Sequence, residues 1–417
     1  MSSLHDSFLD DLPAGWTFDR FKDVVSLRNE KTDEASAEED YLELEDLESC
    51  SGRILSRRNT LEVGSAVTLF KKGDVLFGKL RPYLEKYWEA EFDGKCTGEI
   101  LAFKPQRIAS RFLFYCLGSR WFIERCNALA YGAKMPRVSW PTQLSQFNFP
   151  IPPLPEQQRI AAYLDASCTA IDAAVAAKRR QLETLDALRK STIKRAVMMG
   201  LNPSVKTERT DVEWIPEMPQ HWRMMRVKDV MEFFNTVRVP LSAAERGVMT
   251  ERTYDYYGAS GVIDKVEAYH FDGTYILIAE DGANLLTRSK PLAFLATGKF
   301  WVNNHAHILK PRWGGDDTFF VTLLESQDFS LFVTGAAQPK LTMENLGRFK
   351  LAVPRVTEQK EIAAFIREKD AEFRPLFMQI ERQIETLINY RKSLIHECVT
   401  GQRRITETNI NRVKAHG

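Results

Sequence analysis

The chain has 417 residues, too many for one ordinary domain and well suited to two, each able to bury its own core. Hydrophobic residues make up 44% of it and charged residues 27%, as in a globular soluble chain. No run approaches the roughly 18 uninterrupted apolar residues of a membrane span, so we expect none. The net charge of +1 excludes a globally basic nucleic-acid coat but leaves a local basic surface open.

The N-terminal stretch and the cysteines bear on the compartment. Residues 1–16 include acidic side chains and lack both a basic and an apolar segment, so they do not resemble a signal peptide. The six cysteines form no Cys-x-x-Cys pair, which argues against a zinc knuckle and against a disulfide framework. We therefore expect a cytoplasmic protein with reduced thiols that are mostly packed in its interior.

The chain repeats itself at about half its length, which points to two copies of one unit. Each half opens with a tryptophan followed six residues later by Lys-Asp-Val, at Trp16 and at Trp222, an offset of 206. A loop of the form Gly-Ala-x-x-Pro-basic-aliphatic recurs at residues 132–138 and 335–341, an offset of 203. The pattern from Glu-Gln through Ile-Ala-Ala to Arg-Lys-Ser then keeps a constant offset of 202 over about 40 residues. The two halves therefore share these motifs at nearly constant offsets and differ in the sequence between them.

The repeat alternates a mixed segment of strands and short helices with a long helical segment. Strand-like runs at residues 74–77, 147–149 and 274–278, with amphipathic helical spacing at 111–126 and 318–332, indicate α/β domains of the mixed α+β kind. Prolines, which cannot continue a helix upstream, precede both long helices. In chain order we expect a first domain at residues 1–154, a helix at 155–200, a linker at 201–213, a second domain at 214–354, a helix at 355–402 and a tail at 403–417.

Both long helices carry an apolar stripe with the spacing of a coiled coil. Each would be roughly 60 Å long, more than a compact domain needs. Matching seams favour an antiparallel pair with Lys178 and Ile380 near its midpoint, while packing of each helix on its own domain remains the alternative. Pro375 should kink the second helix or end its first part. Seam positions are Ile366, Phe373, Phe377, Ile380, Ile384, Leu387 and Leu394 in the second helix, and Leu164, Cys168, Ile171, Val175, Lys178, Leu182, Leu185 and Thr192 in the first.

The motifs of nucleic-acid and nucleotide chemistry are missing. A DNA aminomethyltransferase needs an Asn/Asp-Pro-Pro-aromatic tetrapeptide and a glycine-rich cofactor loop, and the sequence has neither. It also lacks a Walker-type loop and a G-x-G-x-x-G dinucleotide motif. The nearest string to the tetrapeptide, at residues 202–204, follows the first helix and is better explained as its stop. We therefore predict no catalytic residue.

Two weaker patterns also favour structure over chemistry. Glu358-Gln359-Lys360 resembles the tail of a nuclease motif, but no Pro-Asp precedes it and the first half has Glu-Gln-Gln at the same place, so helix-start residues explain it better. His305 and His307 could ligate a metal from one face of a strand, but the first half has glutamate and leucine there. We predict no metal site.

Three features carry a resemblance to a known family: the repeat, the Pro-Leu-Pro-Glu-Gln start of the first helix at residues 153–157, and the Arg-Lys-Ser at the close of each helix. The chain resembles the specificity subunit of type I restriction-modification systems over its whole length. The second helix departs from the pattern, because residues 354–359 do not repeat the full proline-rich start.

This resemblance implies two target-recognition domains, each reading one half of an asymmetric bipartite site in double-stranded DNA. Two spacer helices would pair with pseudo-twofold symmetry and carry the modification subunits. It also implies a chain that is not an enzyme and holds no cofactor. S-adenosylmethionine, ATP and Mg would belong to two modification (methyltransferase) subunits and to restriction (endonuclease/translocase) subunits.

In such a protein, affinity would come from Lys and Arg on phosphates, and specificity from a few side chains at base edges in the major groove. Arg137 and Lys340 rank first, because the repeat keeps a basic residue after proline, and phosphate is their expected target. The DNA-binding candidates are Arg57, Arg58, Lys79, Arg81, Tyr83, Lys86, Lys134 and Arg137 in the first domain, and Asn284, Arg288, Lys290, Lys299 and Lys340 in the second.

Two other functions remain open from the sequence. A helical interaction scaffold with RNA- or peptide-binding domains would lack duplex-specific, salt-dependent binding. A modification-restriction enzyme with an unrecognised active site would transfer methyl groups as the purified chain alone.

Overall fold

The computed structural model describes residues 12–32, 40–59, 67–335 and 337–416, and the chain forms two compact units. Unit 1 comprises Met1–Arg180 and Glu381–Gly417, and unit 2 comprises Gln181–Ile380. Both boundaries fall inside the long helices, so each unit holds one globular domain and part of each helix. Most of the stretch considered as a signal peptide, residues 1–11, and Ala336 of the second Gly-Ala loop lie outside the described residues.

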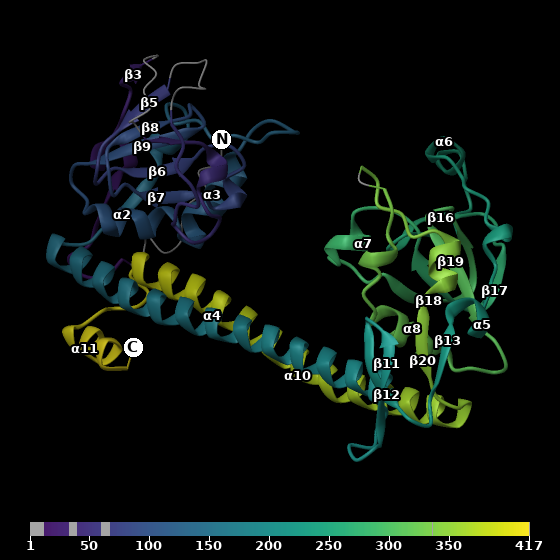
Figure 1. Cartoon of the computed structure of the whole chain (residues 1–417). Coiled ribbons are helices and arrows are strands. Elements are labelled where there is room, and N and C mark those ends of the chain that lie inside the picture. The colour runs from purple at the N-terminus through teal and green to yellow at the C-terminus, as the bar shows by residue number, and fades with distance from the viewer. Residues whose placement is uncertain (1–11, 33–39, 60–66, 336, 417) are drawn as a thin grey trace. The chain divides into compact units, whose positions relative to one another are not determined.

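The two long helices are α4 (Leu154–Met199) and α10 (Val356–Val399), within a few residues of the predicted bounds (Figure 1). Pro155 is the second residue of α4, where a missing N–H costs no helical hydrogen bond. The expectation that Pro375 could end a helix is wrong, because α10 continues through it. Pro375 and Ala371, four residues earlier, are both exposed, so water can reach the carbonyl that loses its partner.

The helices are paired antiparallel within each unit. In unit 1, Arg391 near the end of α10 lies 3.1 Å from Asp172 in the first half of α4. In unit 2, Arg189 near the end of α4 lies 2.7 Å from Asp370 in the first half of α10. The predicted coiled-coil arrangement is therefore confirmed. Seam residues less than about a tenth exposed are Ile366, Phe373, Ile380 and Leu394 in α10, and Leu164, Cys168, Ile171 and Val175 in α4.

One window of α4 is long and apolar enough to cross a membrane by length and composition, with a mean hydropathy of 1.3. It contains charged residues, so the criterion of an uninterrupted apolar run did not detect it. In the structure 44% of this window is buried inside the protein, and a core helix of a globular protein passes the same test. We therefore attribute the apolar side chains of α4 to the seam and to the core of unit 1.

The globular part of unit 1 contains two four-stranded sheets, with strand orders β2-β9-β6-β7 and β3-β5-β8-β4. All paired neighbours are antiparallel except β4 and β8. A separate pair joins β1 to β10, directly before α4. The bounds are β1 (Thr17–Arg20), β2 (Val25–Leu27), β3 (Lys31–Thr32), β4 (Tyr41–Leu42), β5 (Val67–Phe70), β6 (Val75–Gly78), β7 (Tyr87–Glu89), β8 (Gly94–Cys96), β9 (Ile100–Pro105) and β10 (Asn148–Ile151).

The helical spacing predicted for residues 111–126 belongs to two helices, α2 (Ser110–Leu117) and α3 (Arg120–Leu129). The second one starts afresh because the Ser119 hydroxyl accepts the N–H of Phe122 and so caps it. Both helices pack into an aromatic core that also takes up the end of α10. Members of that core include Phe21, Phe77, Phe103, Phe112, Phe122, Phe147 and Phe149, with Ile395, Cys398 and Val399 from α10 and Ile405 after it.

Unit 2 repeats this plan around one six-stranded sheet of order β14-β19-β17-β18-β15-β16. The pair β13-β20 corresponds to β1-β10, and α8 (Asp317–Glu325) corresponds to α2. The end of α4 enters its core through Ile193, Ala196 and Val197, 202 positions before the α10 residues in unit 1. The bounds are β13 (Arg223–Arg226), β14 (Met231–Phe233), β15 (Tyr254–Gly258), β16 (Gly261–Val266), β17 (Phe271–Ala279), β18 (Ala293–Val302), β19 (Ala306–Pro311) and β20 (Lys350–Val353), with β11 (Thr207–Val212) and β12 (Ile215–Pro219) forming a hairpin after α4.

The smaller helices complete both units. In unit 1, α1 precedes β2 and α11 follows α10. In unit 2, α5 lies between β13 and β14, and the other three lie in the connections between later strands. Their bounds are α1 (Phe21–Val24), α5 (Val227–Val230), α6 (Ala243–Gly247), α7 (Asn284–Thr287), α9 (Met343–Arg348) and α11 (Glu407–His416).

The glutamine of each Glu-Gln motif ties a globular domain to its helix. The Gln157 carboxamide accepts the N–H of Ala109 at 2.7 Å and donates to the carbonyl of the proline five residues earlier at 2.9 Å. The Gln359 carboxamide makes the same two bonds, to the N–H of Asp316 at 3.1 Å and to a proline carbonyl at 3.0 Å. Because both glutamines are buried, these bonds fix where each domain joins its helix.

Candidate nucleic-acid interface

In unit 1, two loops meet at one end of the β2-β9-β6-β7 sheet. The chain leaving β6 runs through residues 79–85, and the Gly-Ala-x-x-Pro loop occupies residues 131–138. The N–H of Arg81 donates to the carbonyl of Pro136 at 2.7 Å, and the N–H of Val138 donates to the carbonyl of Lys79 at 3.0 Å. We call this pair of loops recognition loops 1.

Unit 2 builds the same backbone arrangement from different side chains. The N–H of Gly282 donates to the carbonyl of Pro339 at 3.0 Å, and the N–H of Leu341 donates to the carbonyl of Glu280 at 2.8 Å. We call residues 280–290 and 334–341, of which Ala336 is outside the described residues, recognition loops 2. Each partner occupies the repeat position of its counterpart in recognition loops 1, so the two pairs of loops share one scaffold.

The basic residue after proline is anchored by a carboxylate in both units. Arg137 forms a bidentate pair with Glu99 at 3.1 and 3.2 Å, and this hydrogen bond raises the pKa of Arg137. Lys340 lies 3.3 Å from Glu280, whose other oxygen accepts from Arg238 at 2.5 Å. Glu99 directly precedes β9 and Glu280 directly follows β17, so the two acids do not occupy matching positions of the repeat. The predicted phosphate contact of Arg137 and Lys340 stays a prediction, and holding the loops is a role that the sequence did not indicate.

Glu280, whose side chain is 12% exposed, and the fully buried His307 form the base of recognition loops 2. Burial favours the protonated form of Glu280, but the hydrogen bond from Arg238 and the surrounding positive charges outweigh it and lower the pKa of Glu280. Burial lowers the pKa of His307, whose ring bonds the Leu341 carbonyl at 2.7 Å. His305 is bound separately, 2.8 Å from Asp281. No group of three or more His, Cys, Asp or Glu that could hold a metal occurs among the described residues.

The structure gathers most of the predicted contacts on these loops. In recognition loops 1, Lys79 is half-buried, while Arg81, Tyr83 and Lys134 are exposed. Arg81 has a left-handed backbone with φ +52°, where the repeat has Gly282 with φ +100°. A left-handed arginine is strained by about 1 kcal/mol, and strain of this kind collects at functional sites.

In recognition loops 2, Asn284 closes a turn by bonding both backbone groups of Lys290, at 2.9 and 3.0 Å. Arg288, also left-handed at φ +52°, donates to the backbone carbonyl of Glu325. Lys290 is exposed beside it. The Arg288 guanidinium thus makes a hydrogen bond within the protein, whereas the Lys290 side chain is exposed on a turn that Asn284 holds.

Four predicted residues lie away from the recognition loops or are committed elsewhere. Arg58 pairs with Asp46 at 3.0 Å, and Arg57 covers the ring of Phe92 at 3.9 Å, both beside the β3-β5-β8-β4 sheet. Lys86 is half-buried and donates to the carbonyl of Leu44. Lys299 pairs in register with Asp272 at the start of β17, the opposite end of the sheet from recognition loops 2. The sequence cannot tell these positions from loop positions, because it shows charge without strand direction.

Sequence reasoning missed three exposed apolar side chains on the recognition loops. Tyr131 is 58% exposed and Met135 is 42% exposed in recognition loops 1, and Leu286 is 54% exposed in recognition loops 2. An aromatic or aliphatic group held at a loop tip can contact base edges or the thymine methyl group. For Tyr131 the sequence held a signal, an aromatic residue directly before the glycine of the first Gly-Ala loop.

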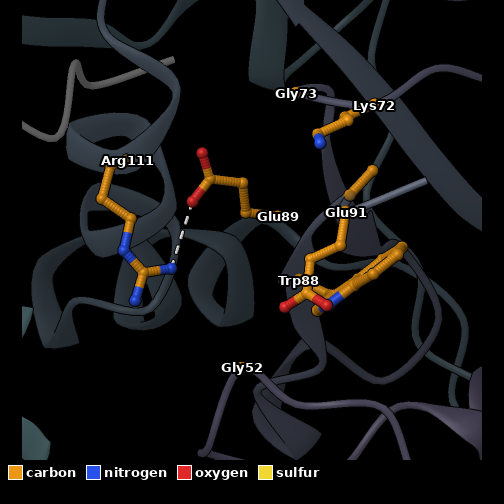
Figure 2. Close-up of a pocket in the computed structure, with 8 residues that line it drawn as sticks. Gly52, Lys72, Gly73, Trp88, Glu89, Glu91 and Arg111 are labelled. Atoms are coloured by element: carbon orange, nitrogen blue, oxygen red, sulfur yellow. Dashed lines mark hydrogen bonds and ion pairs between the residues drawn. The ribbon is translucent and has the colours of Figure 1, made fainter.

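A hollow of about 270 Å³ in unit 1 lies away from the recognition loops, and the charged residues among its lining include Arg111 and Glu89 (Figure 2). Arg111 and Glu89 point toward each other there and form an ion pair at 3.1 Å. Arg111 also reaches Asp165 of α4 at 2.7 Å, and in unit 2 the equivalent pair, Arg367 and Thr318, meets at 3.2 Å. These contacts join domain to helix, so the hollow is not a further candidate interface.

A family model described as "Type I restriction modification DNA specificity domain" matches residues 13–184 and 219–386. The chain belongs to this family. The two matches fall on the two halves of the repeat, and the resemblance drawn from the sequence is confirmed.

Curated relatives agree with the family. The chain is 30% identical over 159 residues to a putative type I restriction enzyme specificity subunit of Haemophilus influenzae, covering 38% of this chain and 37% of the relative. It is 26% identical over 207 residues to the type I restriction enzyme EcoDI specificity subunit of Escherichia coli, covering 49% and 46%. The chain thus spans less than half the length of each of these relatives.

A solved structure shares the fold. Its description is "Structural basis underlying complex assembly and conformational transition of the type I R-M system". The TM-score is 0.71 at 17% identity, over 94% of this chain and 99% of that one. At this identity the likeness shows the fold alone.

Proposed function

We propose that this chain is the non-catalytic DNA-recognition subunit of a type I restriction-modification complex and acts in the cytoplasm. Each globular domain reads one half of a bipartite, asymmetric duplex site. The paired helices set the spacing of the halves and dock two modification subunits, and restriction subunits join the same assembly. S-adenosylmethionine, ATP and Mg are bound by those partners rather than by this chain.

One observation carries the proposal: the two pairs of recognition loops share a backbone scaffold and differ in side chains. Arg81, Tyr83 and Lys134 project from the first, and Lys290 and Leu286 from the second. A protein that reads two different half-sites needs such a constant frame with variable contacts. Phosphate contacts would set the register, and the variable side chains would contact base edges.

The loops supply a local basic surface in a chain of nearly zero net charge. Because neighbouring carboxylates already hold Arg137 and Lys340, the exposed cations of the same loops are the better phosphate contacts. Each phosphate contact releases counterions, so binding should weaken steeply as salt rises.

The test is methylation mapping of DNA from cells that express this chain with its methyltransferase partner. The double variant Arg81→Ala/Lys134→Ala should weaken or change recognition of one half-site and leave the other intact. The matched variant Lys290→Ala should do the converse. Loss of both half-sites from a single-domain change, in a folded protein, would contradict two independent readers.

Purified protein separates this function from an RNA- or peptide-binding scaffold. The chain should prefer duplex DNA to single-stranded RNA, and its affinity for DNA should fall linearly with salt on a double logarithmic plot. Equal affinity for RNA, or no dependence on salt, would refute the proposal.

A further inference from the structure

A cleft of about 520 Å³ in unit 2 lies outside the recognition loops. Its walls come from the start of β13, from the loop after β19 and from the segment that enters α10. Met225, Phe320 and Val353 supply apolar surface. We call it the Trp313 cleft after the exposed tryptophan that lines it.

The charged side chains that line the Trp313 cleft are mostly arginines. Arg223, Arg312 and Arg355 line it and are all exposed. No aspartate or glutamate is among the described lining residues, but Glu358 of α10 contacts two of them, His221 at 2.9 Å and the Trp222 indole at 3.1 Å. In a chain whose acidic and basic residues nearly balance, an opening lined by three exposed arginines favours an anionic ligand.

Trp313 stands at the rim with 73% of its surface exposed and a left-handed backbone of φ +53°. A bulky residue in this region is a genuine outlier, and an exposed tryptophan forgoes the burial that stabilises folding. Tryptophan and arginine are, with tyrosine, the residues enriched at energetically dominant positions of protein interfaces. The composition of the cleft therefore fits a protein partner.

Strand direction separates the Trp313 cleft from the proposed DNA contacts. The strand β19 begins beside the end of β17, where recognition loops 2 lie, and runs antiparallel to it. Arg312 and Trp313 follow the other end of β19, roughly 17 Å away for a strand of this length. Duplex DNA held by recognition loops 2 would face the opposite end of the sheet.

The arginines and the tryptophan of this cleft are not kept at the matching positions of unit 1. At the matching repeat positions, Thr17 replaces Arg223, Gln106 replaces Arg312, and Arg107 replaces Trp313. Arg107 is paired with Asp19 at 3.2 Å. Any ligand that needs the arginines and the tryptophan would bind once per chain, unlike partners that dock on the repeated helices.

We infer that the Trp313 cleft docks an acidic segment of a partner protein, in which carboxylates flank an apolar side chain, at one copy per chain. The carboxylates pair with Arg223, Arg312 and Arg355, and the apolar side chain packs between Trp313 and the cleft wall. This surface is independent of DNA binding and is additional to the symmetric docking on the helices.

The experiment uses the full-length chain and a library of short labelled peptides with aspartate and glutamate around a central leucine or phenylalanine. A matched library replaces the acids by asparagine and glutamine. Fluorescence anisotropy should show saturable binding of acidic peptides at one per chain and none of the amide library. Trp313→Ala and Arg355→Glu should each weaken binding about tenfold or more. Arg107→Glu, at the matching place in unit 1, should leave it unchanged.

Thermal unfolding and duplex binding of all variants establish that each is folded. An absence of saturable acidic-peptide binding, or equal binding of both libraries, would overturn the inference. So would unchanged binding by Trp313→Ala, or two peptides per chain. Displacement of the peptide by duplex DNA would show that the cleft belongs to the DNA surface, and would also overturn it.

Discussion

Replacing Glu280 by glutamine tests whether a buried carboxylate holds recognition loops 2. The Glu280 side chain is 12% exposed and pairs with Arg238, which is 15% exposed, and with Lys340. Breaking a buried ion pair from one side costs about 3 to 5 kcal/mol, because the remaining charge stays uncompensated. Since both side chains keep slight contact with water, we expect Glu280→Gln to lower the free energy of unfolding by about 3 kcal/mol.

Unit 1 supplies the matched control. Glu99 and Arg137 make the same anchor, but they are 31% and 34% exposed. Water screens such a pair, so Glu99→Gln should lower the free energy of unfolding by about 1 kcal/mol or less. The difference between the two variants therefore measures burial and not the number of hydrogen bonds.

The effect of Glu280→Gln should depend on pH. Because the folded-state pKa of Glu280 is lowered, its contribution is fully present above the unfolded-state pKa of about 4.3. The contribution is lost as the pH falls through the lower folded-state pKa. The native protein and the variant should therefore converge in stability only in strong acid.

Urea unfolding at neutral and acidic pH measures these differences, and hydrogen exchange assigns them to a unit. We expect loss of protection at the Leu341 amide, which donates to the Glu280 carbonyl. Equal costs for the two variants, or a difference that does not shrink in acid, would refute the reasoning.

Three further predictions follow from the scaffold, the helix ends and the pairing. Arg81→Gly should keep or slightly raise the stability of the protein, because the repeat has Gly282 at the same left-handed position, yet it should weaken duplex binding. Unfolding and binding assays on the same preparation measure the two effects separately. Residues 206–417 alone should form a twofold dimer that, with its partners, reads a palindromic site. The end of α10 in one copy (Ile395, Cys398 and Val399) can fill the place that the end of α4 (Ile193, Ala196 and Val197) leaves in the other. A truncated form that stays folded and partner-bound yet specifies the asymmetric site would contradict this. Inserting one heptad after Lys178 and another after Ile380 should lengthen the helix pair by about 10 Å, and so the unread DNA spacer by roughly three base pairs, with both half-sites kept. An insertion in one helix alone should lower stability without setting a new spacing. Half-sites mapped at the old spacing would show that the helices do not set the length of the spacer.

The helices and the repeat could be predicted because their signals are local and periodic. Seven-residue spacing places Ile366, Phe373 and Ile380 on one face of a helix, and the structure buries that face. Proline before each helix and a constant offset of 202 located the first residues of both helices to within a few positions. The same offset led to the family, which the two matches of the family model confirm.

Tertiary structure alone decided which loops meet and which charges are committed. The sequence ranks Arg137 and Lys340 first, and it also includes Lys299 among the DNA-binding candidates. Strand order puts the first two against Glu99 and Glu280 and places Lys299 at the far end of its sheet. Such pairings join residues far apart in the chain, so they depend on strand direction and loop path, which periodicity does not encode. For the same reason the sequence did not reveal that the end of α10 completes the core of unit 1.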